Sequence, residues 1–273
     1  MALRKFIKMH GLGNDFLVID ARAEPVELAL AQVRALANRH TGIGFDQLIL
    51  IEPSTVGDVR LRFWNSDGGE VAACGNGSRA AATLLGGQLR LEVGGALLDS
   101  QAMAGGAEVD MGAPRWEWDA VPLAYPMDTA RLPLAWGDCG ETLEHPAALS
   151  VGNPHAVFFV ADAAAIALED IGPTIENDPI FPERVNVGIA QVTGRDHLIL
   201  RVWERGAGPT LACGTGAVAA VAAAQRRGLV DTHVRVSLPG GDLTVNRRAD
   251  GHLLLAGPAV IAFAGEVDLE HYA

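Results

Sequence analysis

The sequence of 273 residues has few cysteines and a deficit of positive charge. Its three cysteines are too few for a disulfide framework in a chain of this size, which predicts a reducing, cytoplasmic compartment. Lysine and arginine number 21 against 33 acidic residues, so the formal net charge is −12. This acidic balance argues against nucleic acid and against an anionic membrane surface as partners.

Long apolar runs are also missing. No run approaches the roughly 18 residues that a helix needs to cross a bilayer, and residues 1–6 are not followed by the apolar stretch of a secretory signal. Hydrophobic residues nevertheless make up 49% of the chain, which is enough to fill a sizeable core. With 32 glycines and 14 prolines, the composition is typical of a turn-rich fold that contains β-strands, and the length suits two domains.

Two of the cysteines lie in similar glycine-rich stretches. One stretch is Ala73-Cys74-Gly75-Asn76-Gly77 and the other is Ala212-Cys213-Gly214-Thr215-Gly216, and each is predicted to start a helix of small residues. A helix start exposes unpaired backbone N–H groups and carries partial positive charge. A thiol there is expected to have its pKa lowered from about 8.5, which would make it a usable base or nucleophile. The glycines leave room for a carboxylate to reach the same N–H groups.

The separation of Cys74 and Cys213, 139 residues, is the period of an internal repeat. Between positions 62 and 81, nine of twenty residues are identical after this shift, whereas chance would supply roughly one or two. The same shift aligns Gln47 with Asn186, and Asn14 with Asn153. Because the matches include arginine, tryptophan and cysteine, we interpret the chain as a duplicated unit.

The duplication predicts an α+β fold of two pseudo-symmetric domains, each a β-rich, barrel-like sheet wrapped around a central helix. The run 217–225 supports this picture, because a helix that is apolar on all sides is buried. We expect residues 1–116 to form the first half, completed by 260–273, and residues 117–259 to form the second half. The active site is expected in the cleft between the halves.

Two related halves would set Cys74 and Cys213 on opposite sides of a bound ligand. A base that removes an α-proton on one face and an acid that delivers a proton to the other face together invert a stereocentre. Helix N–H groups on both sides would hold the α-carboxylate and stabilise the developing carbanion. The sequence contains no lysine context typical of pyridoxal phosphate and no metal-ligand spacing. The pattern therefore predicts epimerisation at an acidic carbon without a cofactor.

The two halves differ where Asn65-Ser66 aligns with Glu204-Arg205. An adjacent acid and base can form a surface salt bridge. Nine residues before Cys213, however, the pair is better suited to a second amino-acid end of the ligand, with arginine for a carboxylate and glutamate for an ammonium group.

Several polar residues have a structural alternative. His155 can cap a turn or tune a neighbouring thiol, and Asn14, Asn65 and Asn186 stand where asparagine commonly serves as a turn residue. Cys139 is expected to be a small buried hydrophobe or simply a surface residue. Structural roles are expected for His10 and His40.

Taken together, the motifs resemble those of the diaminopimelate epimerase family. They extend from residue 10 to about 217 and comprise residues 10–16, 46–47, 65–79, 152–155, 181–182, 186–187 and 204–216. The resemblance implies that Cys74 and Cys213 interconvert LL-2,6-diaminopimelate and meso-diaminopimelate, with His155 and Glu204 influencing the thiols. It also implies that the substrate is bound by Asn14, Gln47, Asn65, Gly75, Asn76, Asn153, Asn186, Glu204, Arg205, Gly214 and Thr215.

Members of this family are typically cytoplasmic enzymes of lysine and peptidoglycan precursor biosynthesis that use no pyridoxal phosphate, and they are often homodimers. Phe263 stands where a tyrosine is expected near the dimer contact. Two other functions are compatible with the pattern. One is a proline racemase or a phenazine-pathway isomerase of the same architecture, which the Glu204-Arg205 pair disfavours because proline lacks a distal charged end. The other is a redox-switched binding protein without turnover.

Overall fold

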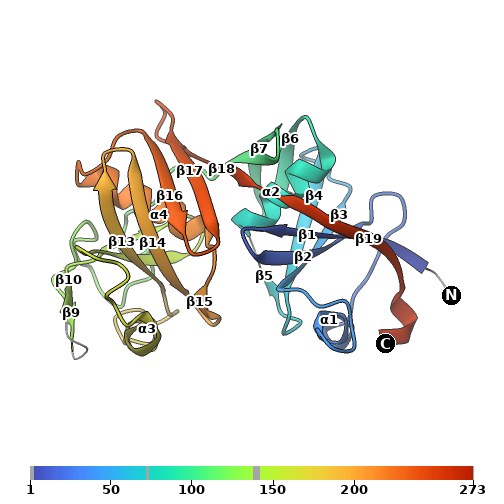
Figure 1. Cartoon of the computed structure of the whole chain (residues 1–273), viewed down its shortest axis with the longest axis horizontal. Coiled ribbons are helices and arrows are strands. Elements are labelled where there is room, and N and C mark those ends of the chain that lie inside the picture. Colours follow the sequence, from blue (N-terminus) through green and yellow to red (C-terminus); the bar gives the residue numbers. More distant parts are fainter. Residues whose placement is uncertain (1–2, 72–73, 138–141, 273) are drawn as a thin grey trace. The chain divides into compact units, whose positions relative to one another are not determined.

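The computed structural model describes residues 3–71, 74–137 and 142–272. The chain folds into two compact units (Figure 1). Unit 1 contains Met1–Asp110 and Ala256–Ala273, and unit 2 contains Met111–Leu255. Cys139, which the sequence predicts to be either a small buried hydrophobe or a surface residue, lies outside the described residues.

Unit 1 is a curved sheet around the helix α2 (Gly75–Leu85), which packs against several of its strands. The strands are β1 (Leu3–Gly11), β2 (Asn14–Asp20), β3 (Gln47–Glu52), β4 (Val59–Asn65), β5 (Glu70–Val71), β6 (Gln88–Val93), β7 (Ala96–Met103), β8 (Gly106–Asp110) and β19 (Val260–Asp268). The remaining elements are α1 (Leu30–Ala37) and the 3₁₀ helix η1 (Leu269–Tyr272). Strand β19 returns to pair antiparallel with β1, while β18 (Leu253–Pro258) spans the division between the units.

Unit 2 repeats this plan around the helix α4 (Gly214–Arg226). Its strands are β9 (Ala135–Trp136), β10 (Leu143–Glu144), β11 (Ala147–Ser150), β12 (Pro154–Phe159), β13 (Asn186–Gly194), β14 (His197–Glu204), β15 (Gly208–Thr210), β16 (His233–Leu238) and β17 (Gly241–Arg247). A second helix, α3 (Leu168–Glu176), connects β12 to β13. The connections that contain a helix join parallel strands, β12 to β13 and β14 to β16, as a crossover does.

The strand registers confirm the duplication predicted from the sequence. In unit 1 the parallel pair β2–β3 sets Phe16 opposite Gln47, and in unit 2 the pair β12–β13 sets His155 opposite Asn186. Both residues of the second pair are those of the first pair after the shift of 139 residues. The predicted fold class, two β-rich units each wrapped around a central helix, is therefore confirmed.

Small side chains let each sheet close on its central helix. Residues 217–224 of α4 are all buried, as are the three alanines at 80–82 of α2. Gly77 shows how close the approach is, because a Cβ atom there would lie 2.7 Å from Cε1 of Phe63. No helix in the described ranges is both long enough and apolar enough to cross a membrane.

Candidate active site

In unit 1, Cys74 is the N-cap residue of α2. Its backbone is extended (φ −146°, ψ 109°), and its Sγ accepts a hydrogen bond from the Gly77 N–H at 3.2 Å. The thiol also donates to Oε1 of Gln47 at 2.8 Å, and Nε2 of Gln47 donates to Oδ1 of Asn65 at 2.9 Å. Residues from two motifs of the sequence, 46–47 and 65–79, are thus brought together at the start of one helix.

Asn14 and Asn76 meet beside this cysteine. Asn76 lies in the first turn of α2, and its Nδ2 donates to Oδ1 of Asn14 at 3.2 Å. Nδ2 of Asn14 in turn donates to Oδ2 of Asp46 at 3.1 Å. Asn14 therefore does more than form a turn, because both ends of its amide are engaged by residues distant in the sequence.

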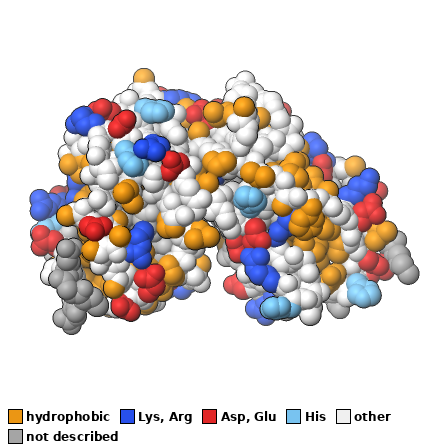
Figure 2. Space-filling view, viewed as in Figure 1, with side chains coloured by type: hydrophobic (Ala, Val, Ile, Leu, Met, Phe, Trp, Pro, Cys, Tyr) orange, Lys and Arg blue, Asp and Glu red, His pale blue; other side chains and the backbone are white. Residues whose placement is uncertain are grey.

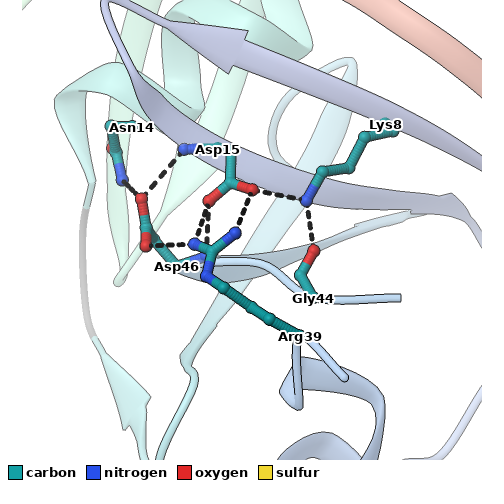
Figure 3. A network of polar contacts seen from close by, with 6 residues as sticks. All are labelled: Lys8, Asn14, Asp15, Arg39, Gly44 and Asp46. Carbon is teal, nitrogen blue, oxygen red and sulfur yellow. Dashed lines mark hydrogen bonds and ion pairs between the residues drawn. The ribbon is translucent and has the colours of Figure 1, made fainter. Parts of the chain in front are cut away.

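Ion pairs and hydrogen bonds form a network around Asp15 and Asp46, next to Asn14 (Figure 3). Asp15 accepts from Lys8 at 2.6 Å and from both terminal nitrogens of Arg39, and Arg39 also contacts Oδ1 of Asp46 at 2.8 Å. Hydrogen bonds from Arg39 and Lys8 hold the pKa of Asp15 well below its ordinary value, although burial opposes this. Asp15 and Asp46 lie within the motifs 10–16 and 46–47, but the sequence alone assigns neither residue a role.

In unit 2, Cys213 is the N-cap residue of α4 in the same geometry (φ −126°, ψ 109°), and its Sγ accepts from the Gly216 N–H at 3.3 Å. Here the expectation of a lowered thiol pKa is wrong. Burial, followed by the negative charge of Glu204, raises the pKa of Cys213 well above its ordinary value, although Thr215 and the Gly216 N–H act in the opposite direction. The loss of hydration outweighs the effect of the helix N-terminus and favours the protonated thiol of Cys213.

His155 is connected to Cys213 through two polar side chains. The histidine is fully buried, and its Nε2 lies 2.9 Å from Oδ1 of Asn153, so that nitrogen carries the proton. Nδ2 of Asn153 donates to Oγ1 of Thr215 at 3.3 Å, and this hydroxyl is 3.5 Å from the sulfur of Cys213. Burial, with a smaller contribution from the charge of Arg205, lowers the pKa of His155 to about 3. His155 is therefore a neutral imidazole at physiological pH.

Glu204 and Arg205 lie at the end of β14, in a loop held by a buried carboxylate. Oε2 of Glu176 accepts from the indole N–H of Trp203 at 2.6 Å, and its Oε1 accepts from the Gly206 N–H at 2.8 Å. Asn186, which is also buried, accepts from the Arg205 N–H at 2.9 Å. Glu176 was not predicted as a functional residue, because no local motif marks a glutamate at the end of α3.

The structure thus brings the predicted residues together in two groups, one in each unit. The unit 1 group contains Asn14, Gln47, Asn65, Cys74, Gly75 and Asn76. The unit 2 group contains Asn153, His155, Asn186, Glu204, Arg205, Cys213, Gly214 and Thr215. Cys74 and Cys213 are both free thiols. Among the described residues, no cluster of three or more His, Cys, Asp or Glu side chains could hold a metal ion.

Two solved structures share this fold at low sequence identity. A hydroxyproline epimerase from Agrobacterium vitis is 14% identical with a TM-score of 0.70, and the match covers 98% of this chain and 91% of that chain. A phenazine biosynthesis protein from Bacillus anthracis is 16% identical with a TM-score of 0.68, covering 98% of this chain and 100% of that chain. The chain therefore has the same fold as these two proteins.

The sequence comparisons are more specific. A family model described as diaminopimelate epimerase matches residues 6–117 and 147–262. A protein of that name from Erythrobacter litoralis (strain HTCC2594) is 56% identical, and the match covers 98% of both chains. The chain belongs to the diaminopimelate epimerase family, which confirms the resemblance of its motifs.

Proposed function

We propose that this protein interconverts LL-2,6-diaminopimelate and meso-diaminopimelate in the synthesis of lysine and of peptidoglycan precursors. Family membership supports the substrate, and one structural observation supports the chemistry. Cys74 and Cys213 occupy equivalent N-cap positions of the central helices of two homologous units, and each accepts a hydrogen bond from the N–H three residues later.

In the proposed reaction, the thiolate of one cysteine takes the α-proton of the substrate, and the electrons of the broken C–H bond remain on the α-carbon and its carboxylate. The thiol of the other cysteine delivers its proton to the opposite face. The cysteines exchange protonation states in each turnover and are reset by proton exchange. Backbone N–H groups at Gly75 and Asn76 in one unit, and at Gly214 and Thr215 in the other, would stabilise the negative charge.

The roles of the two thiols follow from their surroundings. Because burial and the charge of Glu204 raise its pKa, we assign Cys213 as the proton donor, and Cys74 would lose its proton to act as the base. Glu204 would maintain the protonated form of Cys213 until a substrate ammonium group offsets its charge. His155, as a neutral donor to Asn153, would hold the Asn153–Thr215 pair in place without adding charge near the sulfur.

This mechanism requires the two units to meet at one substrate, in a cleft between halves that we assign to residues 1–116 with 260–273 and to residues 117–259. The remaining side chains would then bind the two ends of the substrate. We assign the distal carboxylate to Arg205 and a substrate ammonium group to Glu204. The other binding side chains are Asn14, Gln47, Asn65, Asn76, Asn153 and Asn186.

We further propose a cytoplasmic enzyme that needs neither pyridoxal phosphate nor a metal and that forms a homodimer through unit 1. The support for the homodimer is an exposed apolar segment of β19, where Val260, Ile261 and Phe263 are 46%, 52% and 51% exposed. Figure 2 shows hydrophobic side chains gathered on the face of unit 1 where β1 and β19 lie in Figure 1. Light scattering should give a dimer mass for the parent and a monomer mass for Phe263→Asp, and a monomeric parent would exclude the dimer.

The function is tested by incubating the reduced protein with LL-diaminopimelate in D₂O and following α-deuterium and meso product by NMR. Cys74→Ala and Cys213→Ala should each abolish epimerisation, whereas Cys139→Ala serves as the matched cysteine control and should retain activity. A folded, reduced parent that incorporates no deuterium would exclude this substrate. Full activity of either active-site variant would exclude the two-thiol mechanism.

A further inference from the structure

Arg79, in α2, is a buried cation with few hydrogen-bond partners. Its side chain has no solvent exposure, and no carboxylate forms an ion pair with it among the described residues. Nη1 donates to Oδ1 of Asn76 at 2.9 Å, but Nε and Nη2 are buried with no hydrogen-bond partner in the described part of the chain. Burial lowers the pKa of its guanidinium to about 10. Since a buried charge without a partner costs stability, the residue calls for a functional explanation.

The second unit shows that the fold does not need an arginine at this position. The shift of 139 residues aligns Arg79 with Val218, which is fully buried in α4. The same helix in the same kind of sheet therefore closes over a short apolar side chain. Asp46 likewise aligns with an apolar residue, Val185, which is also buried. The charges at both positions are specific to unit 1.

These two charges lie at the ends of one directional chain of hydrogen bonds. Arg79 donates to Asn76, Asn76 donates to Asn14, and Asn14 donates to Asp46, at 2.9, 3.2 and 3.1 Å. A guanidinium can only donate and a carboxylate can only accept, so the ends determine which way both amides point. Oδ1 of Asn14 is therefore turned toward Asn76. One N–H of the Asn14 side-chain amide donates to Asp46, and no described residue accepts from the other N–H.

We propose that Arg79 is a positioning residue for the substrate. It acts through Asn76, with Asp46 at the far end of the chain, and orients the amide of Asn14. In this orientation Asn14 offers an N–H group to a substrate carboxylate. This inference rests on the proposed function, because it takes Asn14 as a substrate ligand. A reversed amide would offer an oxygen to the carboxylate instead, which would repel it. The nearby positive charge also favours the thiolate of Cys74, whose charge in turn raises the pKa of Arg79.

The test compares Arg79→Met, Arg79→Lys and the control Thr83→Val. Thr83 lies on the same helix and donates to the backbone oxygen of Arg79 at 2.8 Å, so the control perturbs α2 without touching the amides. For Arg79→Met we expect kcat/KM to fall about 10-fold to 100-fold, mainly through KM, as for the loss of a charge-assisted hydrogen bond that orients a ligand. Its Tm should be unchanged or higher. Arg79→Lys, which keeps one donor, should recover part of the loss, and Thr83→Val should stay within about two-fold of the parent.

A second measurement does not depend on turnover. The side-chain NH₂ resonances of Asn14 and Asn76, in protein labelled at asparagine nitrogen, should shift in Arg79→Met and remain unchanged in Thr83→Val. Unchanged resonances, or kcat/KM within two-fold of the parent, would overturn the inference. Failure of Arg79→Met to fold would also overturn it, since the arginine would then be structural. An inactive parent with shifted resonances in Arg79→Met would instead refute the proposed substrate and leave the amide orientation established.

Discussion

Replacing Glu176 with glutamine tests whether one buried carboxylate holds the loop that carries Glu204 and Arg205. Its two oxygens accept from the Trp203 indole N–H at 2.6 Å and from the Gly206 N–H at 2.8 Å. Arg184 adds a contact at 3.2 Å from a side chain that is 54% exposed. A glutamine in the same place has only one acceptor oxygen, so its NH₂ group must face either the Trp203 indole N–H or the Gly206 N–H.

The cost can be estimated from these contacts. Losing charge assistance on one part-buried hydrogen bond and breaking the other should together destabilise the protein by about 2–4 kcal/mol. For a protein of this size this corresponds to a fall in Tm of roughly 5–15 °C. The loosened loop should also bind the distal end of the substrate less well, so we expect KM to rise about ten-fold.

Thermal unfolding by circular dichroism and steady-state kinetics measure the two effects. Arg184→Gln is the matched control, because it removes only the exposed partner and should cost at most about 1 kcal/mol. Adding Trp203→Phe to Glu176→Gln removes a donor that lacks an acceptor and should recover part of the lost stability. A Glu176→Gln protein with the Tm and KM of the parent would refute this account of the loop.

Three further predictions concern the thiol environment of unit 2. Burial lowers the pKa of His155 to about 3, so its imidazole should show no NMR titration between pH 5 and 8. The contribution of this neutral histidine to stability is present above about pH 6.5 and is lost as the pH falls toward 3. His155→Gln should therefore flatten the acid limb of the curve of unfolding free energy against pH. Alkylation of Cys213 by iodoacetamide should be slow at neutral pH and should become faster in Glu204→Gln, because removing the carboxylate lowers the pKa of the thiol; an equal rate in both proteins would exclude this charge effect. Gly216→Ala should lower kcat at least about ten-fold, because its Cβ would lie 2.9 Å from Val202 and 3.2 Å from the sulfur of Cys213. Activity equal to that of the parent would show that the thiol tolerates displacement.

Much of the architecture could be predicted from the sequence because the relevant signals are local and occur twice. A cysteine followed by glycines and then by small apolar residues specifies a helix start and a buried helix wherever it occurs. The structure repeats this arrangement at Cys74 and Cys213 with matching backbone angles. Helix α3 was not predicted, in part because Pro173 lies within it.

The sequence by itself thus determined the duplication, the central helices, the N-cap cysteines and the family. Only the tertiary structure decided the electrostatics around them. Local sequence predicts a lowered pKa for both thiols, yet that of Cys213 is raised because strands from distant parts of unit 2 remove its water. The Arg79–Asp46 chain and the bonds of Glu176 likewise join residues far apart in the sequence. Burial and directional hydrogen bonds depend on which side chains the fold brings together, and no local pattern encodes that proximity.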